Sequence, residues 1–184
     1  MDDLQGKAGG WLADLKTLEA EAAQGNWTSL AELGSCYLTG DRGAAEDEAR
    51  GIALIREAAE KGEAGAQFDM GLFSEKGFYG VEKDFPQSAE WYRKCAMQGG
   101  ADGLLKLGDC YRFGRGVTQD IAFAIICYRQ AGERGSTVAK QTIFRLAENM
   151  ATRPVLEQDS MRVAFSCKLP SIPGEKLNVA KNAL

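Results

Sequence analysis

The sequence predicts an all-α protein in which pairs of helices repeat along the chain. Glycines recur with a period of 37 residues, at Gly34, Gly71 and Gly108. Apolar side chains follow the three- and four-residue spacing of one helix face, as Leu104, Leu107 and Tyr111 do. Hydrophobic residues make up 45% of the 184 residues, enough for a packed core. Because one pair cannot bury its own apolar face, pairs must stack, and we expect a right-handed α-α superhelix, or solenoid.

Three full repeats are expected at residues 27–62, 64–99 and 101–135. The period recurs in three further sets of positions: Gly40, Gly77 and Gly114; Gly25, Gly62, Gly99 and Gly135; and Asp47, Asp84 and Asp120. The second half of each repeat also keeps its pattern, reading IALIREAAEKG, AEWYRKCAMQG and AIICYRQAGERG. Four sets of positions that agree on one period indicate a repeat architecture.

Signals for helix ends mark each repeat as helix, turn, helix. Asp84 stands where an N-cap is expected, and Pro86 falls in the first turn, where its missing N–H costs little. Gly62 and Gly99 are placed to end helices in a left-handed conformation. The glycines at 34, 71 and 108 fall instead inside the first helix, where glycine costs about 1 kcal/mol relative to alanine. Such a repeated cost predicts a close helix–helix approach that admits no side chain.

Both ends of the chain depart from the repeat pattern. Residues 1–26 are expected to be a lead-in and a partial repeat helix, and residues 136–184 a partial repeat, a capping helix and a tail. Within the latter, 137–150 has the pattern of a degenerate first helix. The capping helix is expected at 154–168, where its apolar side chains would cover the last open face. Residues 174–184 are expected as a short helix or a loose tail.

Composition argues against several classes of protein. The formal net charge is −4 and the isoelectric point about 5.1, which is unlike the basic footprint of a nucleic-acid-binding domain. Apolar runs stay well short of the roughly 20 residues that a membrane-spanning helix needs. The first ten residues lack the pattern of a signal peptide, so we expect a cytoplasmic protein. A periplasmic or secreted location is the alternative if a signal peptide has been removed.

The sequence offers no recognisable catalytic, metal or cofactor site, and we expect a protein that is not an enzyme. It contains no histidine, which removes the commonest acid–base residue and metal ligand. Five cysteines lie too far apart for a metal knuckle or a redox pair: Cys36, Cys95, Cys110, Cys127 and Cys167. We expect buried free thiols, with a disulfide in an exported form as the alternative. Gly114-Arg115-Gly116 is expected as a tight turn, since no Gly-Lys-Ser/Thr follows it.

At these residues the chain resembles a known family. LGDCYRFGRGV, ending at Val117, and Gly80-Val81 through Asp84 to AEWYRKCAMQG are similar to Sel1-like repeats, relatives of the tetratricopeptide repeat. The resemblance covers about 27–135 and implies an α-solenoid. It departs from the family pattern at Ala44, where valine is usual, and at Ser74, where tyrosine is usual. The resemblance is specific for architecture and weak for activity.

The resemblance also implies a binding face. In tetratricopeptide-like solenoids the first helix of each pair lines the concave surface, and carrying that over by register gives these residues: Leu38, Phe68, Leu72, Glu75, Lys76, Leu105, Asp109, Arg112, Phe113 and Arg145. Apolar side chains flanked by charged ones are typical of an interface. The alternative is that these side chains pack against a neighbouring helix or the C-terminal cap. Trp91 is expected in the core between helices.

A protein-interaction function follows from the repeat and this face. We expect a module that binds a protein or peptide as an adaptor or scaffold. The alternative is a bacterial immunity protein that neutralises a cognate secreted toxin, because small Sel1-like proteins occur in that role. An enzyme is a remote alternative. Neither the partner nor the oligomeric state can be predicted from the sequence.

Overall fold

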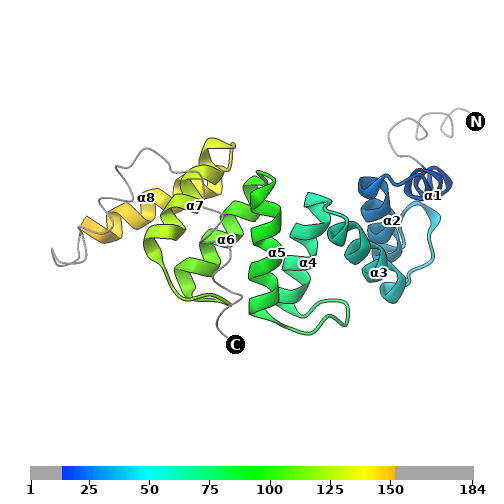
Figure 1. The fold of residues 1–184 in the computed structure, drawn as a ribbon, viewed down its shortest axis with the longest axis horizontal. Coiled ribbons are helices and arrows are strands. Elements are labelled where there is room, and N and C mark those ends of the chain that lie inside the picture. Colours follow the sequence, from blue (N-terminus) through cyan, green and yellow to red (C-terminus); the bar gives the residue numbers. More distant parts are fainter. Residues whose placement is uncertain (1–13, 152–184) are drawn as a thin grey trace, which may run out of the picture. The chain divides into compact units, whose positions relative to one another are not determined.

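The structure, a computed structural model, describes residues 14–151 and consists of α-helices over that range, with one short 3-10 helix and no strand (Figure 1). The helices are α1 (Leu15–Ala23), α2 (Trp27–Thr39), η1 (Asp41–Gly43), α3 (Glu48–Glu60), α4 (Ala64–Lys76), α5 (Phe85–Met97), α6 (Ala101–Phe113), α7 (Ile121–Glu133) and α8 (Thr137–Ala151). The predicted all-α repeat fold is therefore confirmed. The predicted capping helix at 154–168 and the tail at 174–184 lie outside the described residues.

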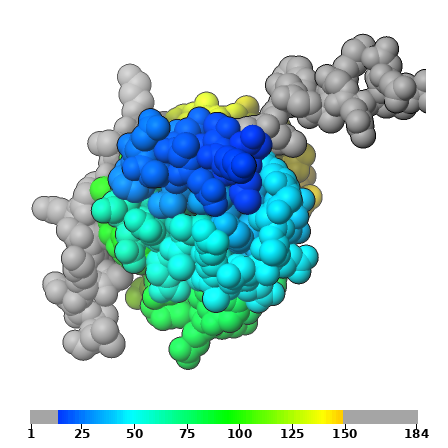
Figure 2. Space-filling model, turned by 90° about the vertical axis from the view of Figure 1, so that its right-hand side faces the viewer, coloured from blue at the N-terminus to red at the C-terminus, as the bar shows by residue number. Residues whose placement is uncertain are grey.

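The chain divides into two compact units with a boundary after Ala66. In the first unit, α1 and α3 both pack against α2. Figure 2 shows this unit with the blue residues of α1 and α2 in direct contact with the cyan residues of α3. In the second unit, α5 packs against α6, α6 against α7, and α7 against α8. Of the described helices, none is long and apolar enough to cross a membrane.

The second helix of each repeat begins at the predicted aspartate. Asp47, Asp84 and Asp120 each accept a hydrogen bond, 2.9 Å long, from the backbone N–H three residues ahead. Pro86 stands in the first turn of α5, as predicted. Gly62 and Gly99 follow the last turns of α3 and α5 with φ of 100° and 85°, a conformation that glycine adopts without strain. Local sequence signals thus determine where these helices begin and end.

Replacing one of these aspartates should weaken the fold measurably. We expect Asp120→Ala to lower the free energy of unfolding by about 1 kcal/mol, because the N–H of Phe123 loses its acceptor at the start of α7. Asp102→Ala is the matched control, since Asp102 stands in the first turn of α6 but does not cap it. Urea denaturation followed by circular dichroism measures both variants. Equal losses in the two variants would contradict the capping role.

The glycines inside the first helices mark close contacts, as predicted. A Cβ added to Gly71 would lie 2.6 Å from ring atoms of Tyr92, and one added to Gly108 would lie 2.6 Å from the ring of Tyr128. In the first unit, a Cβ on Gly34 would lie 2.7 Å from Ile55 Cγ1. Real Cβ atoms do not approach other atoms this closely. Each first helix therefore leaves room for a large side chain of the second helix.

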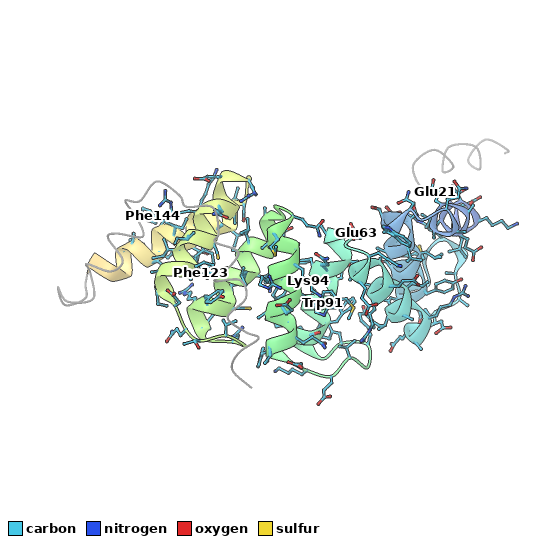
Figure 3. The ribbon with its side chains drawn as sticks, in the orientation of Figure 1. Glu21, Glu63, Trp91, Lys94, Phe123 and Phe144 are labelled. Carbon is cyan, nitrogen blue, oxygen red and sulfur yellow. The ribbon has the colours of Figure 1, made fainter. Side chains whose placement is uncertain are left out.

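The core of the second unit is built around these tyrosines. Tyr92 and Tyr128 are fully buried, and they belong to one cluster with side chains from α6 and α7. Phe123, labelled in Figure 3, is buried in the same cluster and meets the ring of Tyr111 edge-on, with centroids 4.5 Å apart.

Trp91 is buried, as predicted, with Lys94 Nζ 4.0 Å from its ring centroid. The following cysteines are buried free thiols, also as predicted: Cys36, Cys95, Cys110 and Cys127. Cys167 lies outside the described residues.

A candidate partner-binding surface on α4 and α6

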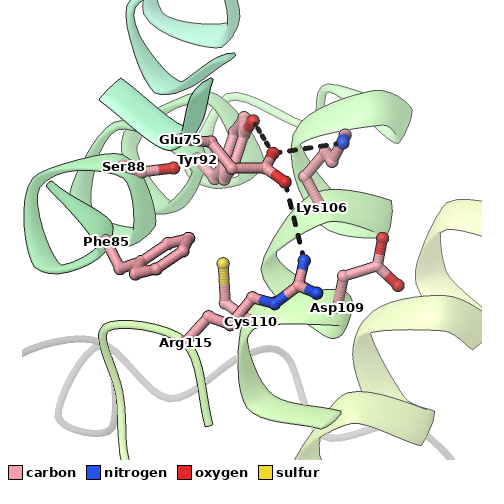
Figure 4. A pocket seen from close by; sticks show the side chains of 8 residues that line it. All are labelled: Glu75, Phe85, Ser88, Tyr92, Lys106, Asp109, Cys110 and Arg115. Atoms are coloured by element: carbon pink, nitrogen blue, oxygen red, sulfur yellow. Dashed lines mark hydrogen bonds and ion pairs between the residues drawn. The ribbon is translucent and has the colours of Figure 1, made fainter. Parts of the chain in front are cut away.

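Glu75, in the last turn of α4, is the centre of a charged cluster in the second unit (Figure 4). Its carboxylate accepts hydrogen bonds from Tyr92 Oη at 2.8 Å and from Lys106 Nζ at 3.2 Å. Lys76 Nζ lies 3.5 Å from this carboxylate, and a guanidinium nitrogen of Arg115 lies 3.7 Å away. One acidic side chain thus holds together cations from α4, from α6 and from the turn that follows α6.

Burial and the neighbouring polar groups shift the pKa of Glu75 in opposite directions. Burial alone would raise the pKa of its carboxyl group, but the hydroxyl of Tyr92 and the ammonium of Lys106 outweigh burial, so the pKa is lowered. The carboxyl group is therefore ionised at neutral pH. Burial and the hydrogen bond to Glu75 both raise the pKa of Tyr92, whose hydroxyl therefore remains a donor.

The turn after α6 brings Arg115 to this cluster. Gly114 ends α6 with φ of 65°, and the backbone N–H of Arg115 donates to the carbonyl oxygen of Cys110 at 2.9 Å. Gly116 has φ of 72°, and a Cβ there would lie 2.1 Å from the carbonyl oxygen of Phe85. The predicted tight turn is confirmed, and its second glycine allows it to touch the start of α5.

A small pocket lies beside the ion pairs. These side chains line it: Glu75, Phe85, Ser88, Tyr92, Lys106, Asp109, Cys110 and Arg115. Burial raises the pKa of the Cys110 thiol to about 12, so the thiol stays protonated at neutral pH and is a poor nucleophile. Asp109 accepts a hydrogen bond of 2.7 Å from the hydroxyl of Tyr128. Both carboxylates of this pocket, Glu75 and Asp109, are thus fixed by hydrogen bonds from other side chains of the protein.

An exposed phenylalanine stands next to the cluster. Phe113, the last residue of α6, is 51% exposed. The guanidinium carbon of Arg112 lies 4.8 Å from its ring centroid, and that of Arg115 lies 5.1 Å from it. Large exposed aromatic side chains flanked by arginine are enriched at interfaces. We call the surface formed by Leu72, Lys76, Lys106, Arg112, Phe113 and Arg115 the α4–α6 surface.

The structure brings together several of the predicted binding residues, in different states of burial. Phe68 and Leu105 are half-buried and pack against the core cluster, with the ring of Phe68 5.8 Å from that of Tyr92. Leu72 is half-buried on α4. Part of the predicted face therefore packs against neighbouring helices, which is the alternative given in the sequence analysis for these residues. The exposed part is centred on Phe113.

Two predicted residues are not among those that define this surface. Leu38 belongs to the first unit, where its side chain packs over Gly51 of α3, with Cδ2 2.7 Å from the position of an added Cβ. Arg145 is exposed on α8. Lys106 and Arg115 join the site although sequence reasoning assigned them no binding role. Their acidic partner is 31 and 40 residues away in the chain, so no local pattern could reveal the pairing.

The fold and this surface define a helix-pair repeat protein, and comparison with known proteins identifies the family of the repeat. The Sel1 repeat family model matches residues 27–63, 64–100 and 101–136. The chain belongs to the Sel1 repeat family, as its sequence resemblance implied. Proteins of this family generally act as protein-interaction modules, of the scaffold or adaptor type.

Solved structures agree with this family. The chain is similar to a Sel1 repeat protein from Oxalobacter formigenes, with 34% identity, a TM-score of 0.69, and coverage of 73% of this chain and 99% of that one. It is also similar to a protective antigen with an SLR fold from uropathogenic Escherichia coli, with 30% identity, a TM-score of 0.67, and coverage of 71% and 28%.

Among curated proteins, the chain is 30% identical over 112 residues to the ERAD-associated E3 ubiquitin-protein ligase component HRD3B of Arabidopsis thaliana. The match covers 60% of this chain and 17% of that protein. It is 26% identical over 105 residues to DAP3-binding cell death enhancer 1 of Rattus norvegicus, covering 57% and 20%. The chain thus spans about a fifth or less of the length of these curated relatives.

Proposed function

We propose that this protein is an adaptor or scaffold that binds a segment of a partner protein on the face formed by its first helices, at the α4–α6 surface. The observation that carries the proposal is the half-exposed side chain of Phe113, with the guanidinium groups of Arg112 and Arg115 4.8 and 5.1 Å from its ring centroid. Fully burying a large aromatic side chain is worth about 1.5–3 kcal/mol, and a partner that covers Phe113 gains the part that its remaining exposure forgoes. The general interaction role of Sel1 repeats supports the proposal, as does the place of one relative in a multi-component ligase.

We expect Phe113, Arg112 and Arg115 to contribute most of the free energy of binding to the partner. Interfaces derive most of their affinity from a small number of well-placed aromatic and arginine residues. Phe113 offers the apolar contact area, and the guanidinium groups of Arg112 and Arg115, which lie over its ring, offer N–H donors. Phe68 and Leu105 are poorer probes of binding, because truncating either also removes contacts within the core.

Truncating Phe113 should therefore weaken partner binding without unfolding the protein. We expect Phe113→Ala to lower affinity about tenfold, which corresponds to about 1.4 kcal/mol. Phe144→Ala is the matched control, because Phe144 on α8 is 65% exposed and lies outside the α4–α6 surface (Figure 3). Isothermal titration calorimetry with the captured partner gives both affinities, and thermal unfolding verifies that each variant is folded.

Site-specific photo-crosslinking identifies the partner to be titrated. A benzoyl-phenylalanine at position 113 should form adducts in extracts of the source cells, and the same group at position 144 should not form the same adducts. Adducts with several proteins of one complex would favour a scaffold, and a single cognate toxin would favour the immunity alternative. Equal crosslinking from both positions, or equal affinities of the two alanine variants, would contradict binding at the α4–α6 surface.

A further inference from the structure

We infer that the segment bound at the α4–α6 surface is acidic: a carboxylate side chain of the partner meets Arg112 and Arg115, and a neighbouring apolar side chain packs on Phe113. This inference rests on the proposed function and specifies the chemistry of the partner. The charge balance of the surface is its first support. Lys76, Lys106 and Arg115 lie 3.2 to 3.7 Å from the Glu75 carboxylate, and Arg112 lies near the Tyr128 hydroxyl that donates to Asp109. Four cations and two carboxylates therefore meet here.

Both carboxylates already accept hydrogen bonds from side chains of this protein. Glu75 accepts from Tyr92 and Lys106, and Asp109 accepts from Tyr128. The side chain of Glu75 is 11% exposed, whereas those of Lys76 and Arg115 are 47% and 48% exposed. The Glu75 carboxylate therefore lies beneath the ammonium of Lys76 and the guanidinium of Arg115. An approaching molecule meets the surplus positive charge first.

The arginines are held in a geometry that suits a carboxylate. Both guanidinium groups lie about 5 Å from the ring centroid of Phe113, and Arg115 comes from a turn that is fixed against α5 by Gly116. A guanidinium presents five N–H donors, more than the contact of Arg115 with Glu75 or that of Arg112 with the Tyr128 hydroxyl requires. Because part of the side-chain entropy is already lost, pairing with a partner carboxylate costs less than it would for free arginines.

The apolar requirement follows from the same residues. Phe113 is exposed beside the two arginines, and Leu72 is half-buried on α4, one helical turn before Glu75 and Lys76. An acidic segment without apolar side chains would leave Phe113 in water. The surface therefore favours glutamate or aspartate alternating with leucine, phenylalanine or similar residues.

A protein segment fits this surface better than a nucleic acid. The whole chain has 26 acidic and 22 basic side chains, so its field repels a long polyanion. Nucleic-acid affinity depends on neutralising many phosphates, and a local surplus of two positive charges is small by that standard. A short acidic segment needs favourable charge only where it docks.

Selection from a library of displayed random 12-residue peptides on the full-length chain tests the inference. We expect selected peptides to be enriched in Asp and Glu next to Leu or Phe. A fluorescent selected peptide should bind at least tenfold more weakly when its Glu and Asp residues are changed to Gln and Asn. Binding should also weaken about tenfold for the double variant Arg112→Gln/Arg115→Gln.

Matched controls separate local charge from net charge. Lys16→Gln/Arg56→Gln removes the same total charge from exposed positions of the first unit and should leave peptide affinity unchanged. Raising NaCl from 50 to 300 mM should weaken wild-type binding several-fold and affect the Arg112→Gln/Arg115→Gln variant less. A single-stranded RNA of 12 nucleotides should bind more weakly than the peptide.

The outcomes distinguish this inference from the proposed function. Selected peptides that bind at the Phe113 surface without acidic residues, or that tolerate the amide substitutions, would overturn the acidic chemistry and leave the binding surface standing. Tighter binding of the RNA than of the peptide would overturn the choice of a protein partner. A selection without any binder, together with no crosslinks from position 113, would overturn the proposed function itself.

Discussion

Gly108→Val should destabilise the protein by about 3 kcal/mol, because the space next to Gly108 is filled by Tyr128. A Cβ at this position would lie 2.6 Å and 2.7 Å from two ring carbons of Tyr128. The ring cannot easily move aside, since it is fully buried and its hydroxyl is bonded to Asp109. Valine would therefore force α6 and α7 apart, although it has a higher intrinsic helix propensity than glycine.

Denaturation in urea monitored by circular dichroism measures the effect. Gly65→Val is the matched control, because Gly65 is an exposed helical glycine whose nearest atoms are the carboxylate oxygens at the end of the Glu63 side chain, 3.1 and 3.4 Å from an added Cβ. The control should change stability by no more than about 0.5 kcal/mol. Tyr128→Leu should reduce the damage when combined with Gly108→Val, because the two side chains compete for one volume. A Gly108 variant as stable as the control would show that the helices are not tightly packed there.

Features with a local or periodic cause could be predicted from the sequence. The aspartate caps depend on hydrogen bonds over three residues, and the glycine ends depend on a backbone conformation that other residues avoid. The repeated glycines predicted a close approach because a helix interior would otherwise favour alanine. The sequence did not say what fills the space, which in the second unit is a tyrosine of the next helix, as with Gly71 and Tyr92.

The helix predicted at 137–150 as a degenerate first helix is α8, and it lacks the glycine that α2, α4 and α6 share. Phe144 is the eighth residue of α8, the position that Gly34, Gly71 and Gly108 occupy in α2, α4 and α6. In those helices the glycine faces the second helix of its own pair. Phe144 is 65% exposed in the described part of the chain. The sequence shows that α8 has Phe144 in place of this glycine. That the position faces a second helix in the other three pairs, and that Phe144 is exposed, is known only from the structure.

The candidate site was harder to predict than the fold. Register alone placed Glu75, Arg112 and Phe113 on one face, and in the structure Arg115 lies against both the Glu75 carboxylate and the ring of Phe113. The same reasoning included Phe68 and Leu105, which pack on the core, because neighbouring positions on a helix differ in burial through side-chain direction. The ion pairs of Glu75 with Lys106 and Arg115 depend on how α4 and α6 are set against each other, which periodicity does not determine.

Glu75→Gln should lower the free energy of unfolding by about 2 kcal/mol at pH 7, because a charged acceptor of hydrogen bonds is lost while its shape is kept. Glutamine can still accept from the hydroxyl of Tyr92, but Lys76, Lys106 and Arg115 would face one another without a counter-charge. Glu82→Gln is the matched control, since Glu82 is exposed in the connection between α4 and α5. It should change stability by no more than about 0.5 kcal/mol.

The pH dependence of the Glu75→Gln effect has a definite sign. The pKa of Glu75 is lower in the folded protein than its ordinary value of 4.5, so the unfolded chain takes up its proton first as pH falls. The stabilising effect of the carboxylate is therefore complete above about pH 6 and declines as pH drops from 4.5 through the folded-state pKa. The stability difference between wild type and Glu75→Gln, measured by urea denaturation at several pH values, should shrink over that acidic range. A difference that stays constant down to pH 3 would show that the ionised carboxylate contributes nothing through its cations, and that any loss in the variant comes from packing alone.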